Sequence, residues 1–226
     1  MRRPSIAEAK NQLNGLEAGS PVLIVDRGHS VARFEPVASG SNPDPDGRLS
    51  RLIRDASGGT PADVLRFARQ ELFAPLGMNH VMIEFDGAGT PEGSSQMLAS
   101  ARDWARFGQL YLDDGRAGGK RILPEGWASY SASPTPNAWV GYGAGFWTNL
   151  GDSFGARYRI GHGWPRDAFF AKGTIGQFVI IIPSERLVIA RFGKTPNWPL
   201  DADGVSDLVR DVVAATRNKE RLAGRD

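Results

Sequence analysis

Apolar residues recur at helical spacing through much of the first two thirds of the chain. At 60–63 and 100–103 a Thr or Ser is followed three positions later by Asp, which is a helix N-cap signature. Apolar positions at i, i+3 and i+4 behind such caps predict amphipathic helices. Helices are expected at 5–14, at 48–56, at 61–73, from 101 to near Gly115, shortly after Pro124, and over 204–216.

The last third changes to strand-like runs rich in Val, Ile and Phe and bounded by turn residues. Strands are expected at 21–25, 31–34, 80–85, 145–150, 157–160, 168–172, 177–182 and 187–192, with a hairpin over 21–35. The run 178–182 is apolar at every position, which is typical of a central strand covered on both faces. Helices, then antiparallel strands, then a terminal helix predict an α+β fold in which an antiparallel β-sheet packs with helices.

The same pattern suggests how the chain divides. Residues 1–36 form a small helix–hairpin segment, and 37–47 form a junction rich in Pro and Gly. Residues 48–216 hold the main α+β region, and we expect the polar tail 217–226 to fray.

Composition excludes several classes of function. The 226 residues are 41% hydrophobic and 23% charged, which is ordinary for a globular protein. A net charge of +2 gives no bulk attraction for nucleic acid or membranes. The absence of cysteine excludes disulfides, thiol nucleophiles and zinc–thiolate sites, and the three widely spaced histidines predict no metal site or cofactor. Without a signal peptide or a run of 18 apolar residues, a cytoplasmic location with no membrane partner is expected.

One resemblance lies in residues 1–36. The matching residues are Ser5-Ile6-Ala7-Glu8-Ala9-Lys10, Leu16-Glu17-Ala18-Gly19, Pro21-Val22-Leu23-Ile24, Arg27-Gly28 and Val31-Ala32-Arg33. This segment resembles the N-terminal part of the Phd/YefM antitoxins, and the resemblance implies a dimer that binds operator DNA and, through a downstream tail, a toxin. With five basic and four acidic side chains, the segment carries only a weak electrostatic footprint for DNA.

A second resemblance covers about 38–216. The matching residues are Glu71-Leu72-Phe73-Ala74-Pro75-Leu76-Gly77-Met78, Ser100-Ala101-Arg102-Asp103-Trp104-Ala105-Arg106-Phe107-Gly108, Ile122-Leu123-Pro124-Glu125-Gly126-Trp127, Tyr142-Gly143-Ala144-Gly145-Phe146-Trp147 and Gly176-Gln177-Phe178-Val179-Ile180-Ile181-Ile182-Pro183. Together they resemble the C-terminal portion of the β-lactamase-related serine hydrolases, which include class C β-lactamases, penicillin-binding proteins and esterases. The resemblance implies a partial serine β-lactamase-like fold and an ancestry in amide or ester hydrolysis.

In that family, acyl transfer uses a Ser-x-x-Lys pair and a Tyr-x-Asn element. The five lysines are residues 10, 120, 172, 194 and 219, and the residues three positions before them are Ala7, Ala117, Phe169, Arg191 and Thr216. No Ser-x-x-Lys exists in the sequence, and the stretch before the helix expected at 48 holds no tyrosine. Tyr130-Ser131-Ala132 lies elsewhere and lacks the Asn, so a helix-end role is favoured for Tyr130. The resemblance therefore assigns no catalytic nucleophile.

The family's third element is a Lys-Thr-Gly-like triad on an edge strand, which supplies a cation and an oxyanion-hole N–H. Thr174-Ile175-Gly176 stands in its place, with Lys172 as the substitute cation and the N–H of Gln177 as the donor by position. We expect Lys172, Thr174, Gly176 and Gln177 to mark the remnant of a substrate cleft without activity of its own, although an ordinary edge strand would carry the same residues.

Two other motifs match a functional pattern only in part. Gly151-Asp152-Ser153-Phe154-Gly155 matches a nucleophile elbow, but the strand expected at 157–160 favours a hairpin turn, with His162 in a loop. Gly193-Lys194-Thr195 echoes a phosphate loop, but the earlier glycine is replaced by Val188.

Three hypotheses remain. The chain is a β-lactamase-related hydrolase region that lacks its nucleophile and is inactive, or an antitoxin-like DNA-binding regulator that carries a hydrolase remnant, or a recombined or truncated reading frame. The partners that these hypotheses imply are a small amide or ester ligand, DNA or a toxin through residues 1–36, and a second copy of the chain.

Overall fold

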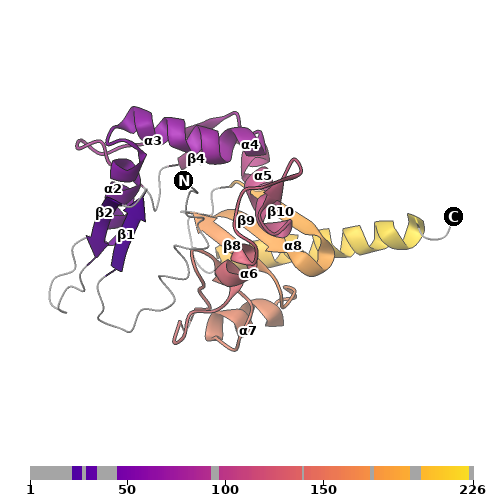
Figure 1. Cartoon of the computed structure of the whole chain (residues 1–226). Helices are drawn as coiled ribbons and strands as arrows, with labels where there is room; N and C mark the ends of the chain where they lie inside the picture. Colours follow the sequence, from indigo (N-terminus) through magenta and orange to yellow (C-terminus); the bar gives the residue numbers. More distant parts are fainter. Residues whose placement is uncertain are drawn as a thin grey trace. The chain divides into compact units, whose positions relative to one another are not determined.

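The computed structural model describes residues 22–26, 29–34, 45–92, 97–138, 140–173, 176–193 and 200–223 (Figure 1). The helix expected at 5–14 lies outside these residues. The chain divides into two compact units. The first consists of 1–75, 79–99 and 122–124, and the second of 76–78, 100–121 and 125–226. Each unit is described by itself.

The second unit is built on an antiparallel sheet. Its described strands are β7 (Trp147–Thr148), β8 (Phe169–Gly173), β9 (Gln177–Ile182) and β10 (Leu187–Arg191). They lie in the order β10-β9-β8-β7, and each neighbouring pair is antiparallel. The sheet and its helices confirm the α+β fold expected from the sequence. The strand expected at 145–150 is shorter, since only its middle two residues pair with β8.

Two helices cover the sheet, α5 (Ala101–Leu112) and α8 (Leu200–Ala223), as Figure 1 shows. Side chains of a strand alternate between its two faces. The core on the α8 face contains Phe170, Phe178, Ile180, Ile182, Ile189, Val205, Val209 and Val213. The core on the α5 face contains Phe146, Phe169, Val179 and Ile181, packed against Trp104, Phe107 and Tyr111. Both faces of β9 are therefore covered, as its unbroken apolar run predicts.

Helix α5 approaches the sheet closely because of a glycine. The helix begins at the predicted cap, where the Ser100 hydroxyl accepts a hydrogen bond of 3.2 Å from the Asp103 N–H. Halfway along it, a Cβ on Gly108 would lie 2.5 Å from Val188 and 2.9 Å from Val179. Only glycine allows this separation between helix and sheet.

Residues 154–161 differ from the sequence prediction. They form helix α7 (Phe154–Gly161), not a strand at 157–160. The reason lies in the cap: the Ser153 hydroxyl accepts a hydrogen bond of 3.1 Å from the Ala156 N–H and so starts a helix. The unit also contains α6 (Trp127–Ala132), close to the helix expected after Pro124, and the short pair β5 (Arg116–Ala117) and β6 (Lys120–Arg121).

Helix α8 is longer at both ends than the helix expected over 204–216, and it continues to Ala223. Arg217 forms an ion pair with Glu185, which lies in the short 3₁₀ turn η2 (Pro183–Glu185) between β9 and β10. This contact joins the helix to the β9–β10 connection.

The first unit holds the hairpin β1 (Val22–Asp26) and β2 (His29–Phe34), whose antiparallel pairing confirms the hairpin expected over 21–35. It continues with α2 (Pro45–Ser57), α3 (Pro61–Ala68), the π-helical turn η1 (Arg69–Phe73), the short α4 (Ala74–Leu76, whose last residue belongs to the second unit), and the pair β3 (Val81–Ile83) and β4 (Met97–Ala99). Helix α2 begins inside the expected junction, and β4 was not predicted.

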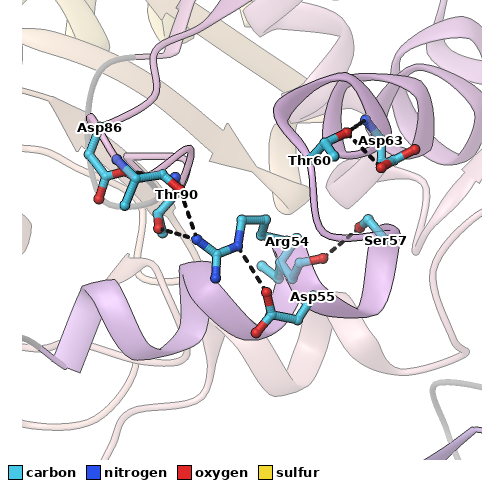
Figure 2. Close-up of polar contacts among 9 residues, drawn as sticks. Arg54, Asp55, Ser57, Thr60, Asp63, Asp86 and Thr90 are labelled. Carbon is cyan, nitrogen blue, oxygen red and sulfur yellow. Dashed lines mark hydrogen bonds and ion pairs between the residues drawn. The ribbon is translucent and has the colours of Figure 1, made fainter.

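Local polar contacts order this unit (Figure 2). The Thr60 hydroxyl accepts from the Asp63 N–H at 3.2 Å and donates to its carboxylate at 2.6 Å, which caps α3 as predicted. Arg54 of α2 donates to the Thr90 hydroxyl at 3.1 Å, while the Asp86 carboxylate accepts from the Thr90 N–H at 2.7 Å. The loop 86–90 is thereby fixed to α2.

No helix in the described ranges has both the length and the apolar character needed to cross a membrane.

Candidate functional site

The residues expected to mark a substrate cleft lie around the turn between β8 and β9. Lys172 lies on β8, Gly176 in the turn, and Gln177 at the first position of β9. Thr174 falls outside the described residues. The four residues therefore do not share one strand.

The sheet also separates two of them by face. Lys172 is exposed and pairs with Phe178 in the strand register, and its ammonium lies 5.3 Å from the centre of the Phe178 ring. Phe178 belongs to the core on the α8 face. Gln177 pairs with Gly173, and the alternation of β9 puts it on the α5 face with Val179 and Ile181. The Lys172 ammonium and the Gln177 amide thus occupy opposite faces.

Strand β8 is not the edge strand that the sequence suggested. It lies between β9 and β7. Strand β7, however, pairs only with Phe169 and Phe170, so it ends before the second half of β8. No described strand continues alongside Ala171–Gly173 on that side.

Gly176, directly before β9, has a special backbone geometry and a contact with one arginine. Gly176 has a φ angle of +94°, a backbone conformation that residues other than glycine rarely adopt. Arg191, at the end of β10, donates a hydrogen bond to the Gly176 carbonyl. A Cβ on Gly193 would lie 3.1 Å from the Arg191 guanidinium, so glycine at 193 leaves room for this side chain.

One polar atom beside this turn stands out. The side-chain oxygen of Gln177 is buried and has no hydrogen-bond partner within the part of the chain that the structure describes. The Gln177 side chain lies against Gly173: a Cβ there would lie 3.0 Å from the Gln177 Cβ and 3.4 Å from its Cγ. The Gln177 side chain therefore fills the space that a side chain at Gly173 would need.

Ser153 does not have the geometry of a nucleophile elbow. A helix does follow it, so the sequence argument against the elbow was wrong on that point. Its backbone, at φ −69° and ψ 156°, is nevertheless ordinary extended chain and not the strained turn that exposes an elbow serine. The hydroxyl is engaged as the cap of α7, and His162 ends that helix with Nδ1 2.7 Å from the Tyr158 carbonyl oxygen.

A partly buried cation that the sequence analysis missed lies next to α7. Arg159 donates to the Asn149 side-chain oxygen at 2.6 Å and to the Thr148 carbonyl at 2.7 Å. Its guanidinium lies 5.0 Å from the Phe170 ring centre. Burial lowers the pKa of Arg159 to about 10. The acceptors in these contacts are neutral, and the contacts join α7 to the end of β7.

The tyrosines of this unit do not supply a Tyr-x-Asn element either. The tyrosines are residues 111, 130, 142 and 158, and none has Asn two positions later. Tyr130 lies in α6 with its ring 5.5 Å from that of Trp127. The Tyr158 hydroxyl donates to Asp203 at 2.9 Å, and this hydrogen bond raises the pKa of Tyr158.

Comparison with known proteins agrees with the second resemblance. A β-lactamase family model matches residues 46–214. Among solved structures, a protein described as a 6-aminohexanoate-dimer hydrolase from Bacillus anthracis matches with TM-score 0.60 and 22% identity over 84% of this chain and 47% of that one. A protein described as a β-lactamase from Bacteroides dorei matches with TM-score 0.46 and 20% identity over 70% of this chain and 54% of that one.

The chain thus spans about half the length of these structural relatives. The search of curated proteins gave no significant match. None of the matches supports the antitoxin resemblance of residues 1–36. The family model covers most of the chain and the fold agrees with it, so the chain belongs to the β-lactamase family.

Proposed function

We propose that this chain supplies the sheet-bearing part of a β-lactamase-related amide or ester hydrolase, and that by itself it forms no acyl-enzyme. One observation carries the proposal: none of the five lysines has a serine or other usable hydroxyl one helical turn before it, apart from Thr216 before Lys219. The Thr216 hydroxyl donates a hydrogen bond of 2.9 Å to the Val213 carbonyl within α8. This is the hydrogen bond that a threonine in a helix commonly makes to its own backbone, and it does not mark Thr216 as a nucleophile.

Acyl-enzyme formation in this family depends on a hydroxyl and a base held close together. A serine hydroxyl is a weak nucleophile until a nearby base takes its proton. Ser153 is the one serine with an elbow-like sequence, and its hydroxyl accepts the hydrogen bond that caps α7. In the described contacts no lysine, histidine or carboxylate accepts its proton.

The ligand class follows from the family and from one structural relative. The relative from Bacillus anthracis is described as acting on a dimer of 6-aminohexanoate, whose two halves an amide joins. We therefore propose a linear amide or its ester counterpart as the ligand class.

Turnover assays test the catalytic half of the proposal. The purified chain is incubated with a chromogenic cephalosporin and with p-nitrophenyl acetate. We expect rates indistinguishable from buffer, with Ser153→Ala behaving like the unaltered chain. A rate above buffer that Ser153→Ala abolishes would identify Ser153 as a nucleophile and refute the proposal.

The regulator hypothesis stays a prediction, and the hairpin at 22–34 is the observation in its favour. A gel shift with DNA from the chain's own promoter region tests it. The hydrolase proposal predicts binding no tighter than to random DNA of equal length. A complex that survives excess random DNA would favour the antitoxin-like regulator instead.

A further inference from the structure

Helix α2 presents an apolar face to solvent. Its apolar residues recur at intervals of three and four positions, so they lie along one side of the helix; they are Leu49, Leu52, Ile53 and Ala56. Leu49 is 62% exposed and Ile53 is 42% exposed, although both are large apolar side chains. A surface helix normally turns such a stripe towards the core. The stripe on α2 is thus an apolar surface that a partner would cover.

The side of α2 that faces the protein is polar instead. Ser50 is only 3% exposed, and Arg54, one turn later, donates to the Thr90 hydroxyl at 3.1 Å (Figure 2). Ser50 and Arg54 lie about 100–140° around the helix axis from Leu49, at about 100° per residue. Turning the apolar stripe inwards would therefore break the contact with the loop 86–90. The rotation of α2 about its axis is fixed with the stripe outside.

Two charged residues follow the edge of the stripe that lies away from Ser50. Arg51 and Asp55 are exposed and lie one turn apart, and the Asp55 carboxylate also accepts from Arg54 at 2.9 Å while its side chain stays 60% exposed. When identical helices pair antiparallel about a two-fold axis, the same edge of each helix meets. An axis next to Ile53 sets Arg51 of each copy opposite Asp55 of the other. The charges on this edge are therefore complementary to themselves.

A parallel pair does not offer the same match. It would bring the edge with Arg51 and Asp55 against the other edge of the second helix. That edge holds Ser50 and Arg54 and is already occupied by the loop 86–90. The charges and the loop together favour the antiparallel arrangement.

We propose that the apolar stripe of α2 is a docking surface for α2 of a second copy of this chain, with the two helices antiparallel and Arg51 paired with Asp55 across the interface. The inference goes beyond the proposed function and does not depend on it. A stripe about two turns long buries less than the roughly 1,200 Å² of a standard stable interface. The dissociation constant is therefore weak, on the order of 100 µM.

Sedimentation equilibrium of the full chain tests whether this dimer forms. Between about 5 and 500 µM, the mean mass should rise from that of a monomer towards that of a dimer. It should not rise further, because a two-fold contact closes on itself. A monomeric mass at every concentration, or assembly beyond a dimer, would overturn the proposal.

Substitutions on the stripe test whether α2 makes the contact. Ile53→Lys places two ammonium groups next to the axis, and Leu49→Lys charges the more exposed position, so each should weaken association at least about tenfold. Met82→Lys, on β3 and 60% exposed, is the matched control and should leave the dissociation constant unchanged. Thermal melting checks that each variant folds. A dimer that survives both stripe substitutions, such as one formed through residues 1–36, would refute the role of α2.

Charge reversal tests the antiparallel arrangement. Arg51→Asp makes both facing edges acidic, and Asp55→Arg makes both basic, so each variant alone should associate roughly three- to tenfold more weakly. An equimolar mixture of the two variants should recover the association of the unaltered chain, because an acidic edge then meets a basic one. If the mixture associates no better than the single variants, these edges do not meet and the proposed pairing is wrong.

Discussion

The sheet and the region of α2, α3, β3 and β4 are ordered in different ways. In the sheet, Ile180, Ile181 and Ile182 have no exposed surface. In the other region, Met82 and Leu98 lie directly opposite each other on β3 and β4 and remain 60% and 59% exposed. The first region is held by burial on both faces of a strand, and the second adds to its few buried side chains a set of caps and loop hydrogen bonds (Figure 2).

This difference predicts which substitutions should lower the free energy of unfolding most. Burial of an apolar side chain contributes more than a local polar contact, because its free energy scales with the area removed from water. The sheet should therefore contribute most of the stability, and it also contains Gln177, one of the residues that the sequence suggests for a cleft.

The largest effect is expected for Ile181→Ala in β9. Ile181 is fully buried on the α5 face, so the substitution removes apolar contacts and leaves a cavity. The free energy of unfolding should fall by about 2–5 kcal/mol. Leu98→Ala, on an exposed position of β4, should change it by less than about 0.5 kcal/mol. Denaturant unfolding measures both, and similar losses would abolish the distinction between the regions.

Gly108→Ala should destabilise the chain by about 1–3 kcal/mol, because the added methyl would lie 2.5 Å from Val188. Helix propensity alone predicts the opposite sign, since Ala favours helices over Gly by about 1 kcal/mol. Gly204→Ala in α8 is the control, as nothing lies within 4 Å of its added Cβ, and it should stabilise. A stabilising Gly108→Ala would show that α5 does not approach the sheet so closely.

Thr60→Ala removes the cap of α3 and should cost about 1 kcal/mol, with faster amide hydrogen exchange in the first turn of that helix. Thr60→Ser restores an accepting hydroxyl and should recover most of the loss. Unchanged exchange in α3 after Thr60→Ala would mean that packing, and not the cap, orders this end of the helix.

The smallest effect concerns the Glu185–Arg217 ion pair. The hydrogen bond from Arg217 lowers the pKa of Glu185. A carboxyl with a lowered folded pKa stabilises the fold above its unfolded pKa of about 4.3, and this contribution is lost as the pH falls through the folded value. Glu185→Gln should therefore cost less than about 1 kcal/mol at neutral pH and nothing at the acidic end of the titration. Denaturant unfolding of both chains at neutral and at acidic pH measures this cost. A loss of unfolding free energy that is the same at both pH values would contradict the ion pair.

Much of this fold could be predicted because its signals are local. The caps at Thr60 and Ser100 fix the starts of α3 and α5, and the unbroken apolar run of β9 identifies a strand covered on both faces. Helix α7 was mistaken for a strand since its apolar residues alternate, while the single cap at Ser153 decides the outcome.

The site was harder to predict than the elements around it. Sequence reasoning groups Lys172 and Gln177 in the remnant of one substrate cleft, but the alternation of paired strands puts their side chains on opposite faces. The importance of Arg159 depends on carbonyl groups contributed by residues 140 and 148, which no local pattern connects to it. Register and long-range contacts of this kind follow only from the folded chain.

Intact-protein mass spectrometry tests the central claim most directly. The purified chain is exposed to a β-lactam, an activated ester and a fluorophosphonate, with an active serine hydrolase treated in parallel. Without a hydroxyl that a neighbouring amine can deprotonate, the chain should keep its unmodified mass while the parallel enzyme is labelled. A stoichiometric covalent adduct on any side chain would contradict the account.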